Sequence, residues 1–251
     1  MDKSIPKFEH PELDGNSFFF EGNQTGILLL HGFTATTVEV RWLAEYLHDK
    51  GFTVSTPLLP GHGTTPQDMN KKKYIDWLNC VEKAYLSLYK SCNTIIVGGE
   101  SMGAVLSLYL AEKFSEIKAI LLYSPAIKVS SLKYVKFLRF FKPIIQKSND
   151  DDLLPWQGYS VYPLFAANEF LHLQKIVLGK PDQVNQPILI FQGAYDKTID
   201  LDSSDIIYSS VNSLIKSKQI MPDSGHVMLL DKEFNQIAKQ TWDFIKSIKI
   251  H

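Results

Sequence analysis

Thr94-Ile-Ile-Val-Gly-Gly-Glu-Ser-Met-Gly103 is the stretch of sequence that decides the fold. Its first four residues form a short apolar run rich in β-branched side chains, which predicts a buried strand. The G-x-S-x-G pattern that follows is typical of a sharp turn from a strand into a helix, where only glycine fits on either side of the serine. Such a turn holds Ser101 in a strained position at the positive end of the helix dipole. Ser101 is therefore a candidate nucleophile.

On both sides of this stretch, short apolar runs alternate with segments of helical periodicity. Strands are expected at 26–30, 52–56, 94–97, 119–123, 188–191 and 218–221, and helices at 38–50, 73–90, 102–114, 202–211 and 235–248. This alternation predicts an α/β protein with a mostly parallel central sheet flanked by helices. Ligands bind at the carboxyl ends of the strands in such sheets, so the residues directly after each strand are candidates for a functional site.

The alternation lapses between about 127 and 187. This stretch carries apolar and charged clusters of its own, and helices are expected within it. We therefore predict a core made of residues 1–126 and 187–251, interrupted by an insertion over residues 127–186.

A serine hydroxyl needs a neighbouring base to act as a nucleophile at neutral pH. When the serine lies on a turn of this kind, the acid and the histidine follow it in that order along the chain, which leaves His172, His226 and His251 as candidates. His226 follows the strand expected at 218–221 and lies in a Ser-Gly-His turn. His172 lies in the insertion and His251 is the terminal residue, so His226 is the favoured base.

The acid that orients this base should follow the preceding strand, as Asp196 does. Its predicted role is to hold the imidazole tautomer and to stabilise the imidazolium form. Asp200 and Asp202 are competing candidates, although acids at such positions more often cap the helix that begins there.

An oxyanion that develops next to Ser101 would need amide donors. One is expected from the backbone N–H of Met102, and the other from the loop that follows the strand at 26–30. In that loop Gly32 permits a turn that aims the Phe33 N–H inward. Loss of one such donor typically costs ~3 kcal/mol of transition-state stabilisation. His31 is expected to be a structural hydrogen-bonding residue at the base of the loop.

Composition narrows the class of protein. The chain has 251 residues, with 26 basic and 27 acidic side chains and a net charge of −1, so no strong field favours nucleic acid as a partner. Its apolar runs are far shorter than the ~18 residues of a membrane span, and residues 1–13 lack the apolar core of a signal peptide. A cytoplasmic location is therefore expected.

Because no metal-ligand spacing or phosphate-binding glycine loop is found in the sequence, neither a metal nor a cofactor is expected.

Several motifs together resemble the bacterial carboxylesterase and monoacylglycerol lipase branch of the α/β-hydrolase superfamily. They are His31-Gly-Phe-Thr34, Leu59-Pro-Gly-His-Gly63, Gly99-Glu-Ser-Met-Gly103, the turn at Asp196 and Ser224-Gly-His-Val227. The resemblance extends over about residues 18–248. It implies that Ser101, Asp196 and His226 form a catalytic triad and that the Phe33 and Met102 amides form an oxyanion hole. It also implies that the insertion is a small cap, a part of this family that varies.

The insertion is the part of the sequence that bears on the substrate. In residues 133–147, apolar side chains alternate with basic ones. Three interpretations are open: packing on the core, an apolar lining for the acyl or aryl group of an ester, and an interfacial helix that contacts anionic lipid. The second makes Phe137, Phe140 and Phe141 candidates for the substrate pocket. The third would add peripheral membrane contact.

The expected function is that of a serine carboxylester hydrolase, which cleaves short- to medium-chain esters through an acyl-enzyme intermediate. The expected partner is a small-molecule ester. A monoacylglycerol lipase and a feruloyl-type esterase are the alternatives within the same fold, and the sequence does not order them because the cap controls acyl length. The alternative from another class, a ligand-binding protein on a hydrolase fold, would be indicated by a missing triad residue, and none is missing.

Overall fold

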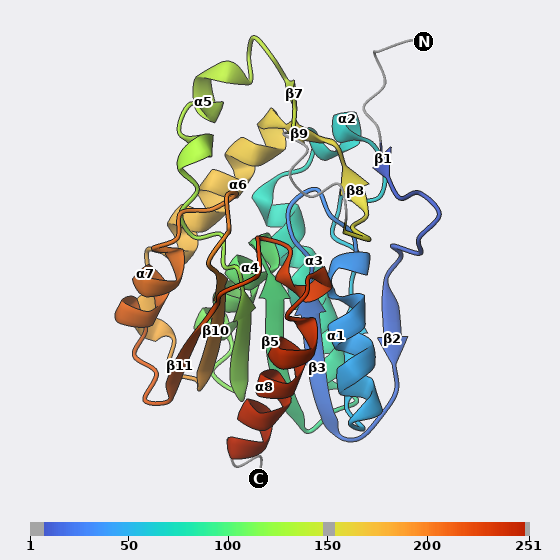
Figure 1. Ribbon diagram of the computed structural model, residues 1–251, viewed down its shortest axis with the longest axis vertical. Coiled ribbons are helices and arrows are strands. Elements are labelled where there is room, and N and C mark those ends of the chain that lie inside the picture. Colours follow the sequence, from blue (N-terminus) through green and yellow to red (C-terminus); the bar gives the residue numbers. More distant parts are fainter. Residues whose placement is uncertain (1–7, 148–153, 249–251) are drawn as a thin grey trace.

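A seven-stranded sheet forms the centre of the computed structural model, which describes residues 8–147 and 154–248 (Figure 1). The strand order is β11-β10-β6-β5-β3-β4-β2, and all neighbours are parallel except β2, which runs antiparallel to β4. The strands are β2 (Phe18–Phe20), β3 (Thr25–Leu30), β4 (Thr53–Thr56), β5 (Thr94–Glu100), β6 (Ala119–Tyr123), β10 (Ile188–Gly193) and β11 (Lys216–Met221). The predicted fold class is confirmed.

Helices cover both faces of the sheet (Figure 1). The larger ones are α1 (Val38–Asp49), α3 (Tyr74–Tyr89), α4 (Met102–Lys113), α6 (Leu164–Val177), α7 (Ser203–Ser210) and α8 (Phe234–Ser247). Side chains of a strand point alternately to its two faces. Accordingly, Leu28 and Leu30 of β3 pack in the hydrophobic cluster formed with α3, α4 and α6, while Ile27 and Leu29 pack in the cluster formed with α1 and α8.

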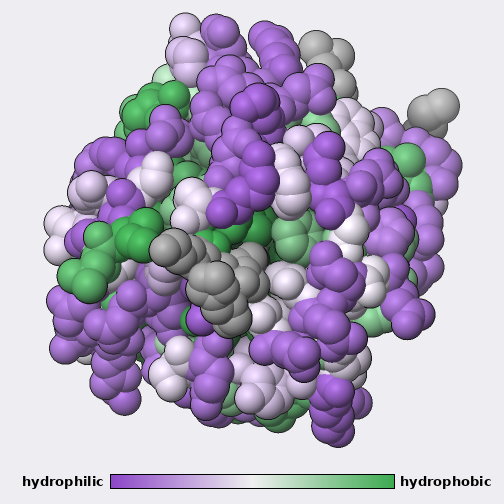
Figure 2. Space-filling view, turned by 90° about the horizontal axis from the view of Figure 1, so that it is seen from below, coloured by the Kyte–Doolittle hydropathy of each residue, from purple (hydrophilic) through white to green (hydrophobic). Residues whose placement is uncertain are grey.

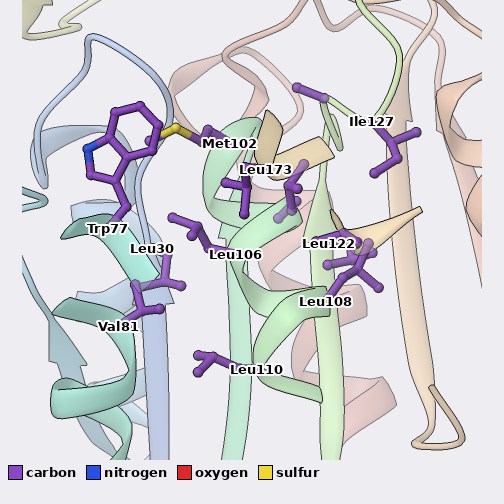
Figure 3. Packing of buried hydrophobic residues seen from close by; sticks show 14 of the residues in the cluster. Leu30, Trp77, Val81, Met102, Leu106, Leu108, Leu110, Leu122, Ile127 and Leu173 are labelled. Carbon is purple, nitrogen blue, oxygen red and sulfur yellow. The ribbon is translucent and has the colours of Figure 1, made fainter. Parts of the chain in front are cut away.

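Helix α4, which begins directly after Ser101, is buried along most of its length. Figure 3 shows Leu106 and Leu110 of this helix in the same cluster as Trp77 of α3 and Leu30 of β3. A helix packed by apolar side chains on nearly all sides is held firmly in place. The end of β5 and the start of α4 are therefore fixed relative to each other.

The segment between β6 and β10 contains short elements and one long helix, α6. Besides α6 they are η1 (Ser130–Leu132), α5 (Val135–Leu138), β7 (Ile144–Gln146), β8 (Gly158–Tyr159), β9 (Val161–Pro163) and η2 (Pro181–Gln183). Figure 1 shows α5, β7, β8 and β9 beyond the carboxyl ends of the parallel strands. The opposite end of the molecule is covered mainly by hydrophilic residues (Figure 2).

The part of the chain that the structure describes contains three further elements, β1 (Phe8–Glu9), which pairs with β8, α2 (Pro66–Met69) and η3 (Met228–Leu230). Across the described residues, no helix combines the length and the apolar character that crossing a membrane requires.

Candidate active site

Ser101 lies on the sharp turn between β5 and α4. Its φ of 56° and ψ of −114° are strained for a residue with a side chain. The two flanking glycines are required by close backbone approach: a Cβ on Gly99 would lie 2.5 Å from the carbonyl carbon of Gly103, and a Cβ on Gly103 would lie 2.0 Å from the carbonyl oxygen of Leu30. The turn therefore has the geometry that the glycine spacing predicts.

Ser101, His226 and Asp196 form one chain of hydrogen bonds. His226 Nε2 lies 2.9 Å from Ser101 Oγ, and His226 Nδ1 lies 2.8 Å from Asp196 Oδ2. All three side chains are buried. In a neutral imidazole only one ring nitrogen carries a proton. When Nδ1 carries it and donates it to the carboxylate, Nε2 is unprotonated and accepts the hydrogen bond from the serine hydroxyl. The arrangement can thus take a proton from Ser101 and stabilise the resulting imidazolium.

Asp196 is held in its ionised form by the groups around it. Burial acts to raise the pKa of this carboxyl, but the His226 ring and the amides of Ile199 and Thr198 outweigh it, so the pKa lies below its ordinary value. The Ile199 and Thr198 N–H groups donate to Oδ1 at 3.1 and 2.9 Å, and the Gln192 amide donates to Oδ2 at 3.3 Å. These bonds leave Oδ2 directed at the imidazole.

The competing candidates lie elsewhere. Asp200 accepts hydrogen bonds from Ser130, and Asp202 pairs with Lys128 at 2.6 Å. Asp202 occupies the N-cap position of α7, but its side chain makes no capping hydrogen bond. His172 lies 3.4 Å from Asn168 on α6, and His251 lies outside the described residues.

The loop after β3 lies against Ser101. A Cβ on Gly32 would be 3.1 Å from Ser101 Cβ, which shows how closely the loop passes. His31 accepts from the Leu59 N–H at 3.1 Å through Nε2 and donates to the Gly32 carbonyl at 2.9 Å through Nδ1, and burial lowers its pKa to about 4. His31 is therefore a neutral structural residue of the loop. Met102 is the first residue of α4, whose first-turn N–H groups have no acceptor within the helix.

Residues 26–173, more than half of the chain, match the model of the alpha/beta hydrolase fold family. The chain belongs to this family.

Relatives of this α/β hydrolase match it over nearly their whole length. It is 31% identical to a thermostable monoacylglycerol lipase of Bacillus sp. (strain H-257), over 94% of this chain and 96% of that protein. It is 28% identical to a carboxylesterase of Bacillus subtilis (strain 168), over 92% and 96%. A solved structure from work on two metagenome-derived lipolytic enzymes, LipS and LipT, has a TM-score of 0.89 at 26% identity and covers 93% of this chain and 98% of that one. The predicted resemblance is confirmed.

Several residues that position the site of the α/β hydrolase were missed in the sequence. Ser124 Oγ, at the end of β6, donates to the His226 carbonyl at 2.7 Å. Glu233 accepts from Ser224 Oγ at 2.6 Å and Asp231 accepts from the Gly225 N–H at 3.0 Å, so both brace the loop before the histidine. The acids are next to the Ser-Gly-His turn in sequence, which is a signal that could have found them. No sequence pattern around Ser124 indicates that it contacts the histidine loop.

The three phenylalanines predicted to contact substrate lie at the surface. Phe137, Phe140 and Phe141 are 69%, 67% and 83% exposed, and the Phe140 ring packs edge-on against Phe165. Closed pockets bury the side chains that line them, so this exposure does not favour a lining role in the present conformation. Their role as substrate contacts stays a prediction. Within residues 8–147 and 154–248 no group of three or more histidine, cysteine or acidic side chains is placed to hold a metal ion.

Proposed function

We propose that Ser101 is the nucleophile of a carboxylic ester hydrolase, with His226 as its base and Asp196 as the orienting acid. The observation that carries this proposal is the hydrogen-bonded chain of 2.9 and 2.8 Å that joins the three buried side chains. Fold alone does not establish an activity. Here the residue types, their order along the chain and their contacts all fit acyl transfer.

In the proposed mechanism Ser101 Oγ attacks the ester carbonyl carbon while His226 Nε2 takes the hydroxyl proton. The negative charge that forms on the carbonyl oxygen is held by the backbone N–H groups of Phe33 and Met102. The tetrahedral intermediate collapses, the alcohol leaves with the proton from His226, and an acyl-enzyme remains. Water, deprotonated by the same imidazole, then attacks the acyl carbon and releases the acid and Ser101.

The relatives agree with ester hydrolysis, since the two curated ones are named as a monoacylglycerol lipase and a carboxylesterase. We expect p-nitrophenyl butyrate to be hydrolysed with a burst of p-nitrophenol and a fluorophosphonate probe to label Ser101. Ser101→Ala should abolish both, whereas Ser115→Ala, on an exposed serine after α4, should leave both unchanged. A folded wild-type protein that neither hydrolyses esters nor reacts with the probe would be a ligand-binding protein on a hydrolase fold.

The proposed substrates are short- to medium-chain esters. The monoacylglycerol lipase at 31% identity makes monoacylglycerols the first alternative, and hydroxycinnamate esters are the second. A panel of p-nitrophenyl esters from C2 to C12, monoacylglycerols of the same lengths and methyl ferulate, compared by kcat/KM, separates the three. A maximum among the monoacylglycerols or with ferulate would replace the proposed preference.

Residues 127–186 are proposed to act as a cap over the site. This proposal is supported by the position of α5, β7, β8 and β9 beyond the carboxyl ends of the strands (Figure 1). It is also supported by the stacking of Phe170 of α6 on Phe33, with ring centroids 5.7 Å apart. A cap at this place would limit the acyl groups that reach Ser101. Exchange of residues 127–186 for the corresponding segment of a relative should therefore change the acyl-length preference, and an unchanged preference would contradict the proposal.

The surface of residues 133–142, here called the basic aromatic patch, is proposed to make peripheral contact with anionic lipid. It exposes Tyr134, Phe137, Phe140 and Phe141 among four cations, Lys133, Lys136, Arg139 and Lys142. No acidic residue occurs between 127 and 147, so the charge suits an anionic membrane, and the aromatic rings suit its interface.

Co-sedimentation with vesicles tests the basic aromatic patch. Binding is expected to phosphatidylglycerol vesicles and not to phosphatidylcholine vesicles, and Phe140→Ser combined with Phe141→Ser should remove it. Leu214→Ser combined with Ile215→Ser is the matched control, because these two apolar residues are 98% and 51% exposed on another part of the molecule. Failure to sediment with either vesicle would remove the proposal.

A cytoplasmic location is also proposed. It is supported by the two cysteines, Cys80 and Cys92, which are both free thiols, as is usual in a reducing compartment. Fractionation of the source cells followed by an activity assay tests the location.

A further inference from the structure

Glu39, in the first turn of α1, is a buried acid that takes no part in the proposed chemistry. Its side chain is only 3% exposed and lies behind the loop that carries Phe33. Its Oε2 accepts a short hydrogen bond from the Gly32 N–H, and its Oε1 accepts one from the Trp156 indole N–H at 3.3 Å. Burying a carboxylate costs free energy unless the group is hydrogen-bonded or paired. A buried acid held by two hydrogen bonds therefore calls for a structural or chemical role.

The hydrogen bond from the Gly32 N–H to Glu39 restricts the backbone of a residue that has no side chain to limit its rotation. The Gly32 N–H is held by Glu39, and the Gly32 carbonyl accepts from His31 Nδ1 at 2.9 Å. In a trans peptide the carbonyl and the following N–H point in opposite directions. With the Gly32 carbonyl directed at His31, the N–H of Phe33 must therefore face the other way. The Gly32 N–H lies in the peptide plane before the glycine and the Gly32 carbonyl in the plane after it. Because glycine has the greatest backbone freedom of any residue, the two anchors together are needed to restrict rotation about both of its backbone bonds, which sets the direction of the Phe33 N–H.

The second bond connects the loop to the segment between β6 and β10. Trp156 is close to three other contacts between that segment and the loop. The Tyr159 N–H donates to the Thr34 carbonyl at 3.0 Å, Thr36 Oγ1 donates to the Gln157 amide oxygen at 2.7 Å, and Lys147 Nζ donates to Thr34 Oγ1 at 2.6 Å. The loop is thus clamped between α1 and the segment around β8.

We propose that Glu39 is a positioning residue, which ties Gly32 to Trp156 and so lets the cap segment set the direction of the Phe33 N–H. This inference rests on the proposed oxyanion role of Phe33. It predicts that the carboxylate affects the transition state more than the binding of the ester, because an oxyanion donor is used only when the charge has formed.

The electrostatic surroundings give this role a pH dependence. Among residues 8–147 and 154–248, the charged and titratable groups that face Glu39 are His226 from the loop after β11, Lys147 from the segment after β7 and Glu100 at the end of β5. Burial raises the pKa of Glu39 to about 7 despite its bond to Gly32. Burial and then the neighbouring Glu39 raise the pKa of Glu100 well above its ordinary value.

Two consequences follow from ionisation of Glu39. An ionised carboxylate is the stronger acceptor, so its link to Gly32 tightens as the pH rises through about 7. Its negative charge also favours the imidazolium form of His226. Removal of the charge should therefore move the acid limb of the kcat/KM profile to lower pH.

The test compares Glu39→Ala, Glu39→Gln and Trp156→Phe with Glu45→Gln, which removes an exposed acid from the same helix. Rates on p-nitrophenyl butyrate are divided by the concentration of active sites from the burst. We expect Glu39→Ala to lower kcat by ~10- to 100-fold with KM changed less than about twofold. Glu39→Gln should recover part of the loss, because its amide oxygen can still accept from Gly32, and it should shift the acid limb. Glu45→Gln should match the wild type.

The partner of the link supplies an independent check. Trp156→Phe keeps the apolar ring but removes the N–H, so it should lower kcat less than Glu39→Ala does. The double variant should be no worse than Glu39→Ala alone, since both changes break one connection. Should Glu39→Ala fail to fold, the pH profile of Glu39→Gln decides.

A normalised kcat of Glu39→Ala within twofold of the wild type, or a Glu39→Gln profile that superimposes on the wild-type profile, would overturn the positioning role. Failure of the proposed function looks different, since it would appear as wild-type turnover in Ser101→Ala. An inactive Ser101→Ala together with unaffected Glu39 variants would overturn only the inference made here.

Discussion

Gly103→Ala is expected to destabilise the protein strongly, because the first turn of α4 packs directly on the end of β3. The added Cβ would lie 2.0 Å from the Leu30 carbonyl oxygen and 2.5 Å from its carbonyl carbon, whereas ordinary contacts begin at 3.4 Å. Both are backbone atoms and cannot rotate away, so the helix or the strand must move by about 1 Å or more. We expect a cost of about 3 kcal/mol, which for a chain of this size lowers Tm by roughly 6–12 °C.

Thermal and urea unfolding of Gly103→Ala measure this cost. Gly179→Ala is the matched control, since its Cβ would meet only the carbonyl oxygens of Ile176 and Lys175 at 3.1 and 3.4 Å, and its stability should change by less than about 1 kcal/mol. Because Ser101 immediately precedes α4, the folded fraction of Gly103→Ala should also react more slowly with a fluorophosphonate. Equal unfolding midpoints for Gly103→Ala and the wild type would refute the argument from close packing.

Three further outcomes are expected. Asp196→Asn should lower kcat by about 10⁴-fold with little change in KM, because an amide favours the wrong imidazole tautomer, and a loss below tenfold in ester hydrolysis would contradict the orienting role. Burial raises the pKa of Glu39 from 4.5 to about 7. The folded protein therefore keeps a proton that the unfolded chain releases, and stability should fall by at most about 3 kcal/mol as the pH rises from about 4.5 to about 7. Burial also raises the pKa values of Glu100 and Glu112, so these acids contribute to the fall in both proteins. Urea unfolding at pH 5 and pH 8 should therefore show a smaller fall in Glu39→Gln than in the wild type, whereas an equal fall in both would assign it to other groups. Leu106→Ala, at a fully buried position in α4, should cost about 2–5 kcal/mol in the same assay, against less than about 1 for the half-exposed Leu86→Ala.

Local patterns in the sequence were enough to predict six of the seven strands of the central sheet, the long helices of the core and the turn at Ser101, whereas the short edge strand β2 was missed. The reason is that periodicity and glycine spacing act over a few residues, where the backbone itself limits the choices. The predicted strand at 94–97 extends to Glu100 in the structure, so only the last residues before the turn were missed. Order along the chain also singled out Asp196 and His226, which tertiary contacts then place next to each other.

The segment from 127 to 186 shows the limit of such patterns. The apolar and basic residues of 133–147 were compatible with a buried helix, a pocket lining or an interfacial helix. In the structure the helix spans only Val135–Leu138, with Val135 buried and the aromatic side chains of Phe137 and Phe141 exposed. Which side of a short element is buried depends on what packs against it. Hydrophobic periodicity over about ten residues does not contain that information.

The sequence by itself thus determined the class of sheet, the turn at Ser101 and the order of the three candidate catalytic residues. Tertiary structure alone decided how the loop of Phe33 is held. Glu39 is 7 residues from Gly32 and 117 from Trp156, yet its carboxylate contacts both. Contacts of that kind form only when distant elements pack, so they are set by the shape of the whole core rather than by any local pattern.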